Sequence, residues 1–255
     1  MNWLENPQSI KRDFDRDGYV ALPGFYDAAQ MAELQQNIDR FIRDVVPTLP
    51  ADHVFYEDKS DKVTLKQIQQ MGMHDPWFGD LFNNGPFRKV SEILLADQVV
   101  PKNMQYFNKP AQVGKPTPPH QDGYYFMLNP CEAVTMWFAL DHVDEANGCV
   151  RYVTGSHRLG MREHGRTQTL GFSQGMTDFG TVDDLANERA FPEKPGDLLV
   201  HHALTIHRAG GNTTTDRTRR ALGFIYYGQR AREDVAAHEA YQKKLAEEMA
   251  TAGKI

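Results

Sequence analysis

The sequence predicts an α+β fold that is mainly β, in which antiparallel strands form a sandwich or barrel and helices pack outside it. Two observations support this prediction. Up to residue 97 the apolar residues recur at helical spacing, whereas later segments are short runs rich in β-branched and aromatic residues, bounded by Gly, Pro and Asn. We expect one domain over 1–255, with a helical part at 1–97, a β core at 98–230 and a C-terminal helix at 231–252.

The helices are predicted from amphipathic patterns. Residues 28–46 carry a stripe of apolar side chains opposite a polar face, and residues 87–96 carry a second one. Residues 47–70 show no strong period and are expected to form loops plus a short element. The charged tail at 234–250 has the pattern of a solvated amphipathic helix.

The strands are predicted from apolar runs between turn residues. The clearest four are 134–140, 150–153, 198–200 and 220–227. Asn147-Gly148 lies between two of these runs and predicts a hairpin. Pro195-Gly196-Asp197 predicts a turn just before another.

Composition and charge exclude several classes of protein. With 28 Lys and Arg against 34 Asp and Glu, the net charge of −6 does not suit a nucleic-acid partner. No apolar run is long enough to span a membrane, and the charged N-terminus lacks the apolar segment of a signal peptide. Two cysteines cannot build a disulfide framework or a four-thiolate zinc site. We expect a cytoplasmic protein with a small-molecule partner and no nucleic-acid or membrane partner; oligomeric state carries no sequence signal.

His120 and Asp122 are the first candidate metal ligands. Two residues apart on a strand, they project from one face and supply two of the three ligands of a non-heme Fe(II) facial triad. The third should be a histidine on a distant strand, and His201, His202 and His207 compete for that place. We favour His207, because a turn-rich segment and two arginines entering a strand follow it. His201 and His202 are expected in the core or on the outer face of the sheet.

Several motifs occur together in a defined order. They are NKP at 108–110, HQD at 120–122, the downstream Trp137, ANGCVRYVTGSHRLG at 146–160, PGD at 195–197 and HRAGGN…RRAL at 207–222. With them, the run from Gln105 to Tyr227 resembles the phytanoyl-CoA dioxygenase family of Fe(II)/2-oxoglutarate oxygenases. DGYVALPGF and MHDP in the N-terminal part match more loosely. One departure is TGSH at 154–157, where the family has PGSH.

The resemblance implies a double-stranded β-helix, or cupin-like jelly roll, for the core. It implies that His120, Asp122 and His207 hold Fe(II) and that Arg219 binds the distal carboxylate of 2-oxoglutarate. The spacing from His207 to Arg219 is one residue longer than in the family, so Arg217 and Arg220 stay open as alternatives. Three further residues fall where the family lines the co-substrate pocket, and these are Gln105, Trp137 and Lys66.

The implied activity is oxidation of a small molecule at an unactivated carbon, with O2 and 2-oxoglutarate consumed and succinate and CO2 released. Asp122 favours hydroxylation, because related halogenases have a small residue in place of this carboxylate. No basic patch suits the phosphates of an acyl-CoA. The aromatic residues Tyr124, Tyr125 and Phe126 follow the metal-binding strand, so some of them should face the substrate.

Two other classes of function stay open. One is a cupin-like metalloenzyme that uses the same three ligands without 2-oxoglutarate. The other is a non-catalytic jelly-roll binding protein whose histidines are structural. His157 is expected to be a turn or hydrogen-bonding residue, and Cys131 a small loop or core residue and not a nucleophile.

Overall fold

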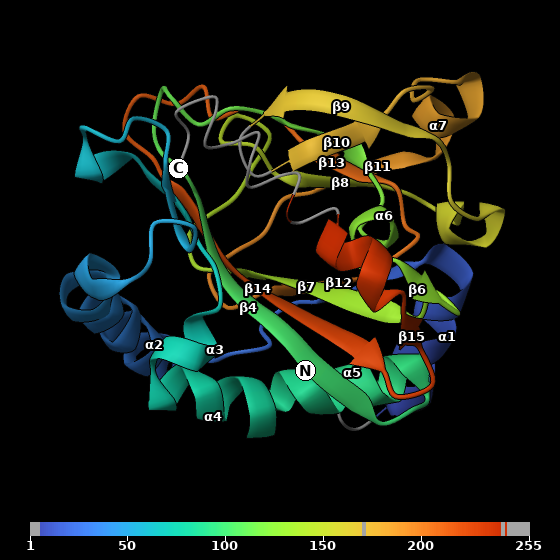
Figure 1. Ribbon diagram of the computed structural model, residues 1–255, viewed down its shortest axis with the longest axis horizontal. Helices are drawn as coiled ribbons and strands as arrows, with labels where there is room; N and C mark the ends of the chain where they lie inside the picture. The colour runs from blue at the N-terminus through green and yellow to red at the C-terminus, as the bar shows by residue number, and fades with distance from the viewer. Residues whose placement is uncertain (1–5, 170–171, 241–242, 244–255) are drawn as a thin grey trace.

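The computed structural model of the chain describes residues 6–169, 172–240 and 243. Two antiparallel sheets lie one above the other at its centre (Figure 1). The larger sheet contains, in spatial order, β1 (Tyr19–Leu22), β12 (Leu198–His202), β7 (Ala133–Ala139), β14 (Arg219–Gly228), β4 (Val99–Lys109), β3 (Leu65–Ile68) and β2 (Val54–Tyr56). The smaller one contains β11 (Glu188–Phe191), β8 (Val150–Val153), β13 (His207–Ala209) and β5 (Thr117–His120). This arrangement is typical of the double-stranded β-helix and confirms the predicted fold class.

Two short strand pairs complete the β structure. They are β9 (His164–Thr169) with β10 (Phe172–Met176), and β6 (Leu128–Asn129) with β15 (Arg232–Glu233). The first pair lies beside the smaller sheet at the top of Figure 1.

Helices cover the outer face of the larger sheet (Figure 1). They are α1 (Pro7–Asp17), α2 (Ala28–Arg40), α3 (Met71–His74), α4 (Pro76–Asn84) and α5 (Pro86–Leu95). α2 continues through a π-helical turn, Phe41–Val45, and a 3-10 turn, Val46–Thr48, and thus matches the predicted helix. Further short helices are α6 (Gly123–Phe126), α7 (Val182–Asn187) and the 3-10 turns Lys62–Thr64 and Ser156–Leu159.

The larger sheet separates a core from a cavity because its side chains alternate between two faces. On β14, Leu222, Phe224 and Tyr226 belong to the core under the helices, where Phe224 stacks on Phe87 of α5 at a ring-centroid distance of 3.9 Å. Burial of each such side chain contributes about 1.5–3 kcal/mol. Arg219 and Ala221 lie on the opposite face, toward the smaller sheet. The core therefore fixes which residues of β14 face the cavity.

The prediction of a hairpin at Asn147-Gly148 is wrong. β7 and β8, the strands on either side, belong to different sheets and do not pair. The side chain of Asn147 instead builds a turn that carries the chain from one sheet to the other. It accepts a hydrogen bond from the Asp144 backbone N–H at 2.8 Å and donates to the carbonyl oxygens of His142 and Thr218 at 2.8 and 3.3 Å.

The N-terminal part is less helical than predicted. β1 pairs with β12, and β2 and β3 extend the larger sheet beyond β4, so residues 1–97 also contribute strands. These strands have three or four residues each, which is too short for a period to emerge from the sequence. The turn predicted at Pro195-Gly196-Asp197 is present, with Gly196 at a φ of +93°.

In the C-terminal tail, residues 235–240 are helical and residue 234 precedes this helix, whereas residues 241–250 apart from 243 lie outside the described residues. Among the described residues, no helix has both the length and the apolar character needed to cross a bilayer.

Candidate metal centre

A cavity lies between the two sheets. β5, β8 and β13 of the smaller sheet form one wall, and β3, β4, β7, β12 and β14 of the larger sheet form the other. The three predicted metal ligands and the predicted co-substrate residues Arg219, Trp137 and Lys66 all line this one cavity.

His120, Asp122 and His207 come together although 87 positions separate the two histidines. His120 ends β5, Asp122 follows two residues later, and His207 begins β13 directly opposite His120 in the antiparallel ladder. The Nε2 atoms of His120 and His207 lie 3.4 and 3.6 Å from Oδ1 of Asp122. All three candidate ligand atoms lie within 4.8 Å of one another. Two imidazoles and one carboxylate on one side of a common point form the facial arrangement that non-heme Fe(II) sites use.

Hydrogen bonds preset the tautomer of both imidazoles. Nδ1 of His120 lies 2.8 Å from the carbonyl oxygen of Pro118, and Nδ1 of His207 lies 3.0 Å from that of Thr205. A carbonyl oxygen only accepts, so both Nδ1 atoms carry the proton and both Nε2 atoms present a lone pair toward Asp122. Metal-bound histidines in proteins are oriented in this way.

The protonation states also suit a metal. Burial, followed by the neighbouring imidazoles, lowers the pKa of His207 well below its usual value, so the ring is neutral at pH 7. Burial alone would raise the pKa of Asp122, but the neighbouring imidazoles of His207, His120 and His201 outweigh it and hold that pKa well below its usual value. A neutral imidazole and a carboxylate are the forms that bind metal.

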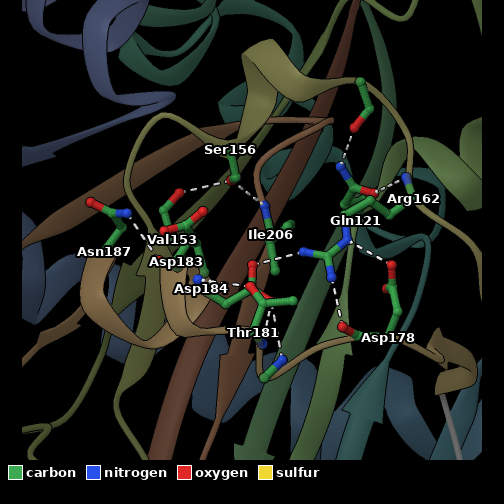
Figure 2. A network of polar contacts seen from close by, with 12 residues as sticks. Gln121, Val153, Ser156, Arg162, Asp178, Thr181, Asp183, Asp184, Asn187 and Ile206 are labelled. Atoms are coloured by element: carbon green, nitrogen blue, oxygen red, sulfur yellow. Dashed lines mark hydrogen bonds and ion pairs between the residues drawn. The ribbon is translucent and has the colours of Figure 1, made fainter.

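A polar network anchors the two segments that carry these ligands (Figure 2). The fully buried Gln121 donates to the carbonyl oxygens of Gly160 and Leu204 at 2.9 and 2.7 Å, and its Oε1 accepts from the Arg162 backbone N–H at 2.8 Å. On the other segment, Ser156 Oγ accepts from the backbone N–H of Ile206 at 2.9 Å. Both ligand segments are therefore held by bonds to neighbouring loops.

Arg162 extends the same network to α7 and the segment before it, because its guanidinium donates to Asp184 at 2.7 Å and to Asp178 at 3.1 Å (Figure 2). Sequence reasoning missed this role of Gln121 and Arg162. The one signal in the sequence was the amide between the two ligands of the HQD motif.

Arg219 lines the same cavity as the three candidate ligands. Its side chain is almost fully buried, and its guanidinium carbon lies 5.1 Å from the centroid of the Trp137 ring. Its Nε is buried without a hydrogen-bond partner among the described residues. Burial lowers the pKa of Arg219 to about 10, so the group is charged at pH 7. A buried charge with an unmatched donor costs free energy unless an anion binds it.

Neither alternative arginine lies at the cavity. Arg220 points to the opposite face of β14 and pairs with Asp141 at 2.7 Å. Arg217 pairs with Asp144 at 2.8 Å on the surface. The geometry therefore brings Arg219 to the site and leaves the other two outside.

Lys66 and Lys109 line the same cavity. Lys66 lies 3.0 Å from Glu57. Lys109 is directly opposite Arg219 in the β4–β14 ladder and donates to Thr117 Oγ1 at 3.2 Å and to the Lys115 carbonyl. Burial, followed by repulsion from Arg219 and Lys66, holds the pKa of Lys109 well below its usual value. Sequence reasoning did not single out Lys109.

Two groups of predicted residues lie away from the cavity wall. Gln105 is buried and accepts a hydrogen bond at 2.6 Å from Gln67, and it is Gln67 that lines the cavity. Tyr124 stacks on His164 and Tyr125 donates to the Gln174 carbonyl at 2.6 Å. The third aromatic residue of this group, Phe126, packs on Tyr227, so none of the three lines the cavity.

The remaining candidates have the following places. His202 packs against Phe14, and burial lowers its pKa to about 4. His157 lies in a 3-10 turn with its Nε2 3.2 Å from the Asp15 carbonyl oxygen. Burial raises the pKa of the Cys131 thiol to about 11, which keeps it protonated at pH 7. His201, expected in the core or on the outer face, is buried on the inner face and contacts Asp122.

Comparison with known proteins shows which family the chain matches. The model of the phytanoyl-CoA dioxygenase (PhyH) family matches residues 14–221. The 1-deoxypentalenic acid 11-beta-hydroxylase of Streptomyces exfoliatus is 27% identical over 226 residues, covering 84% of this chain and 77% of the relative.

Two solved structures share the fold. The epimerase SnoN from nogalamycin biosynthesis, in complex with Fe3+, alpha ketoglutarate and nogalamycin RO, gives a TM-score of 0.72 at 23% identity and covers 90% of this chain and 86% of its own. EctD from S. alaskensis, with 2-oxoglutarate and 5-hydroxyectoine, gives 0.70 at 22% identity and covers 86% and 74%. With the family model spanning most of the sequence and the triad in place, the chain belongs to the phytanoyl-CoA dioxygenase family of Fe(II)/2-oxoglutarate-dependent oxygenases.

Proposed function

We propose that the protein is a hydroxylase that uses Fe(II), 2-oxoglutarate and O2 to oxidise a small molecule at an unactivated carbon. One observation carries this proposal: two imidazoles with preset Nε2 lone pairs and one carboxylate share a cavity with a buried arginine whose Nε has no partner among the described residues. Such a cavity offers both halves of the site, a metal position and a receptor for a keto-acid carboxylate.

In this proposal His120, Asp122 and His207 hold the metal. When bound, the iron and 2-oxoglutarate supply oxidative decarboxylation, which yields succinate and CO2 and the oxidising power for the substrate. Arg219 grips the distal carboxylate, and the Trp137 ring keeps the guanidinium in place. Lys66 and Lys109 line the same cavity and offer further nitrogen donors to a dianion. Gln105 contributes through Gln67, which it holds against the cavity.

Hydroxylation is favoured over other outcomes by two facts. Asp122 would hold the metal through its own oxygen, which would leave no place there for a halide. A hydroxylase is among the relatives that align over most of the chain. The epimerase and EctD share the fold, and their structures hold small molecules, nogalamycin RO and 5-hydroxyectoine. We also propose that 1–255 act as one oxygenase domain, because the N-terminal helices pack on the sheet that carries Arg219.

The test is conversion of 2-oxoglutarate to succinate by the purified protein under air. We expect formation of succinate that depends on added Fe(II), increases when a true substrate is present in a metabolite library, and is accompanied by a product heavier by one oxygen atom. A protein that binds Fe(II) but converts no 2-oxoglutarate with any library member supports the cupin-like alternative. A protein that binds no Fe(II) supports the binding-protein alternative. Either result refutes the proposal.

A further inference from the structure

The two oxygens of Asp122 have different surroundings. Oδ1 lies on the side of His120 and His207, at 3.4 and 3.6 Å from their Nε2 atoms. Oδ2 is held by two other side chains, with Thr135 Oγ1 donating at 2.5 Å and His201 Nε2 at 3.1 Å. Thr135 and His201 are paired residues on the neighbouring strands β7 and β12 of the larger sheet. Two side chains of this sheet therefore bond the carboxylate of Asp122, which follows β5 of the smaller sheet.

His201 has the opposite tautomer from the two candidate ligands. A carboxylate only accepts hydrogen bonds, so Nε2 of His201 must carry a proton to bond Oδ2. Nδ1 then accepts, and it lies 3.0 Å from the hydroxyl of Tyr152, which can donate. Tyr152 is fully buried and packs between Tyr19 and His201. The ring of His201 is thus held from both nitrogens.

These two hydrogen bonds give His201 a different role from the candidate ligands, although the ring centroids of His201 and His207 are only 4.2 Å apart. The Nε2 atom that would bind a metal is occupied by its proton and by Asp122. The arrangement also leaves Oδ2 fully engaged, so Asp122 presents only Oδ1 to the cavity.

We propose that His201 is a positioning residue, fixed by Tyr152, that keeps Asp122 a ligand through one oxygen and thereby leaves positions on the metal open for 2-oxoglutarate and O2. This inference rests on the metal centre of the proposed function. Partners of this kind behind a metal ligand typically change metal affinity by about 10- to 100-fold.

The experiment measures Co(II) binding by the apoprotein without air, because the visible absorption of Co(II) reports its coordination and no turnover is needed. His201→Phe keeps the ring and removes the donor, whereas His201→Gln places an amide N–H near the position of Nε2. Tyr152→Phe removes only the hydroxyl that holds Nδ1. Tyr19→Phe is the matched control, since its hydroxyl bonds Thr154 and its ring stacks on Tyr152 without touching Asp122.

We expect His201→Phe to weaken Co(II) binding about 10-fold or more and to change the visible spectrum, because Oδ2 of Asp122 then keeps only the hydrogen bond from Thr135 and has a lone pair that can turn to the metal. Tyr152→Phe should shift both readouts in the same direction by a smaller amount. His201→Gln and Tyr19→Phe should stay within about threefold of the wild type. If His201→Phe does not fold, the Gln and Tyr152→Phe variants carry the test.

Three results would overturn the inference. A folded His201→Phe protein with wild-type affinity and spectrum makes His201 an ordinary core residue. A loss in His201→Gln as large as in His207→Gln makes it a metal ligand. A wild-type protein that binds no Co(II) refutes the metal centre itself, and with it the proposed function, whereas the first two results leave that function intact.

Discussion

Replacement of Arg219 by methionine should weaken the binding of 2-oxoglutarate by about 150-fold. Arg219 is 4% exposed, its guanidinium carries a charge at pH 7 despite a pKa lowered to about 10 by burial, and its Nε has no partner among the described residues. Removing one member of a buried, hydrogen-bonded charge pair typically costs 2–5 kcal/mol. A loss of about 3 kcal/mol corresponds to about 150-fold in Kd. Methionine keeps the length and apolar character of the side-chain stem, so the packing against Trp137 is largely retained.

The assay is calorimetric titration of 2-oxoglutarate into the protein loaded with Zn(II), which binds without turnover. Arg217→Met is the matched control, because the same substitution there removes a surface arginine already paired with Asp144. Its Kd should stay within about threefold of the wild type. The reasoning is refuted if Arg219→Met binds within threefold of the wild type, or if Arg217→Met shows the larger loss.

Three further predictions concern a ligand, the core and a buried acid. Asp122→Ala removes one of the three metal ligands, so Fe(II)-dependent succinate formation should fall by at least about 100-fold; retention of a tenth of the wild-type rate would contradict it. Phe224→Ala opens a cavity beside Phe87 in the core. It should lower the free energy of unfolding by about 3–5 kcal/mol and Tm by about 10 °C in a thermal scan. A Tm shift under about 2 °C would count against the packing described. Burial raises the pKa of Glu193 well above its usual value, and its Oε2 has no partner among the described residues. The folded protein therefore binds the carboxyl proton of Glu193 more tightly than the unfolded chain does. Its stability should fall as the pH rises from about 4.3 toward the folded pKa. Glu193→Gln should therefore match the wild type in Tm near pH 4 and exceed it increasingly at higher pH, and a pH-independent difference would contradict this.

The three residues that lie together as a candidate metal site could be identified from the sequence because they stand in local and ordered motifs. The spacing of His120 and Asp122 is set within one segment, and the turn and arginines after His207 distinguish that histidine from His201 and His202. Arg219 could be separated from its neighbours only by the register of β14. Since adjacent strand residues point to opposite faces, a shift of one residue would have put Arg220 in the cavity.

What the sequence could not predict depends on contacts across the fold. Asn147-Gly148 has the local signature of a hairpin, but pairing is decided by which sheet each strand joins. The aromatic run after the ligands turns away because α6 begins directly after Asp122. His201 was expected in the core or on the outer face of the sheet, and only the distance to Asp122 Oδ2 reveals its contact with a candidate ligand.

The most direct test of the metal centre is visible absorption after Fe(II) and then 2-oxoglutarate are added to the protein without air. We predict a weak charge-transfer band from the chelate in the wild type and its loss in His207→Ala, since the third ligand is then missing. A wild-type protein that gives no band, or a His207→Ala protein that keeps it, would contradict the convergence of His120, Asp122 and His207 on one ferrous ion.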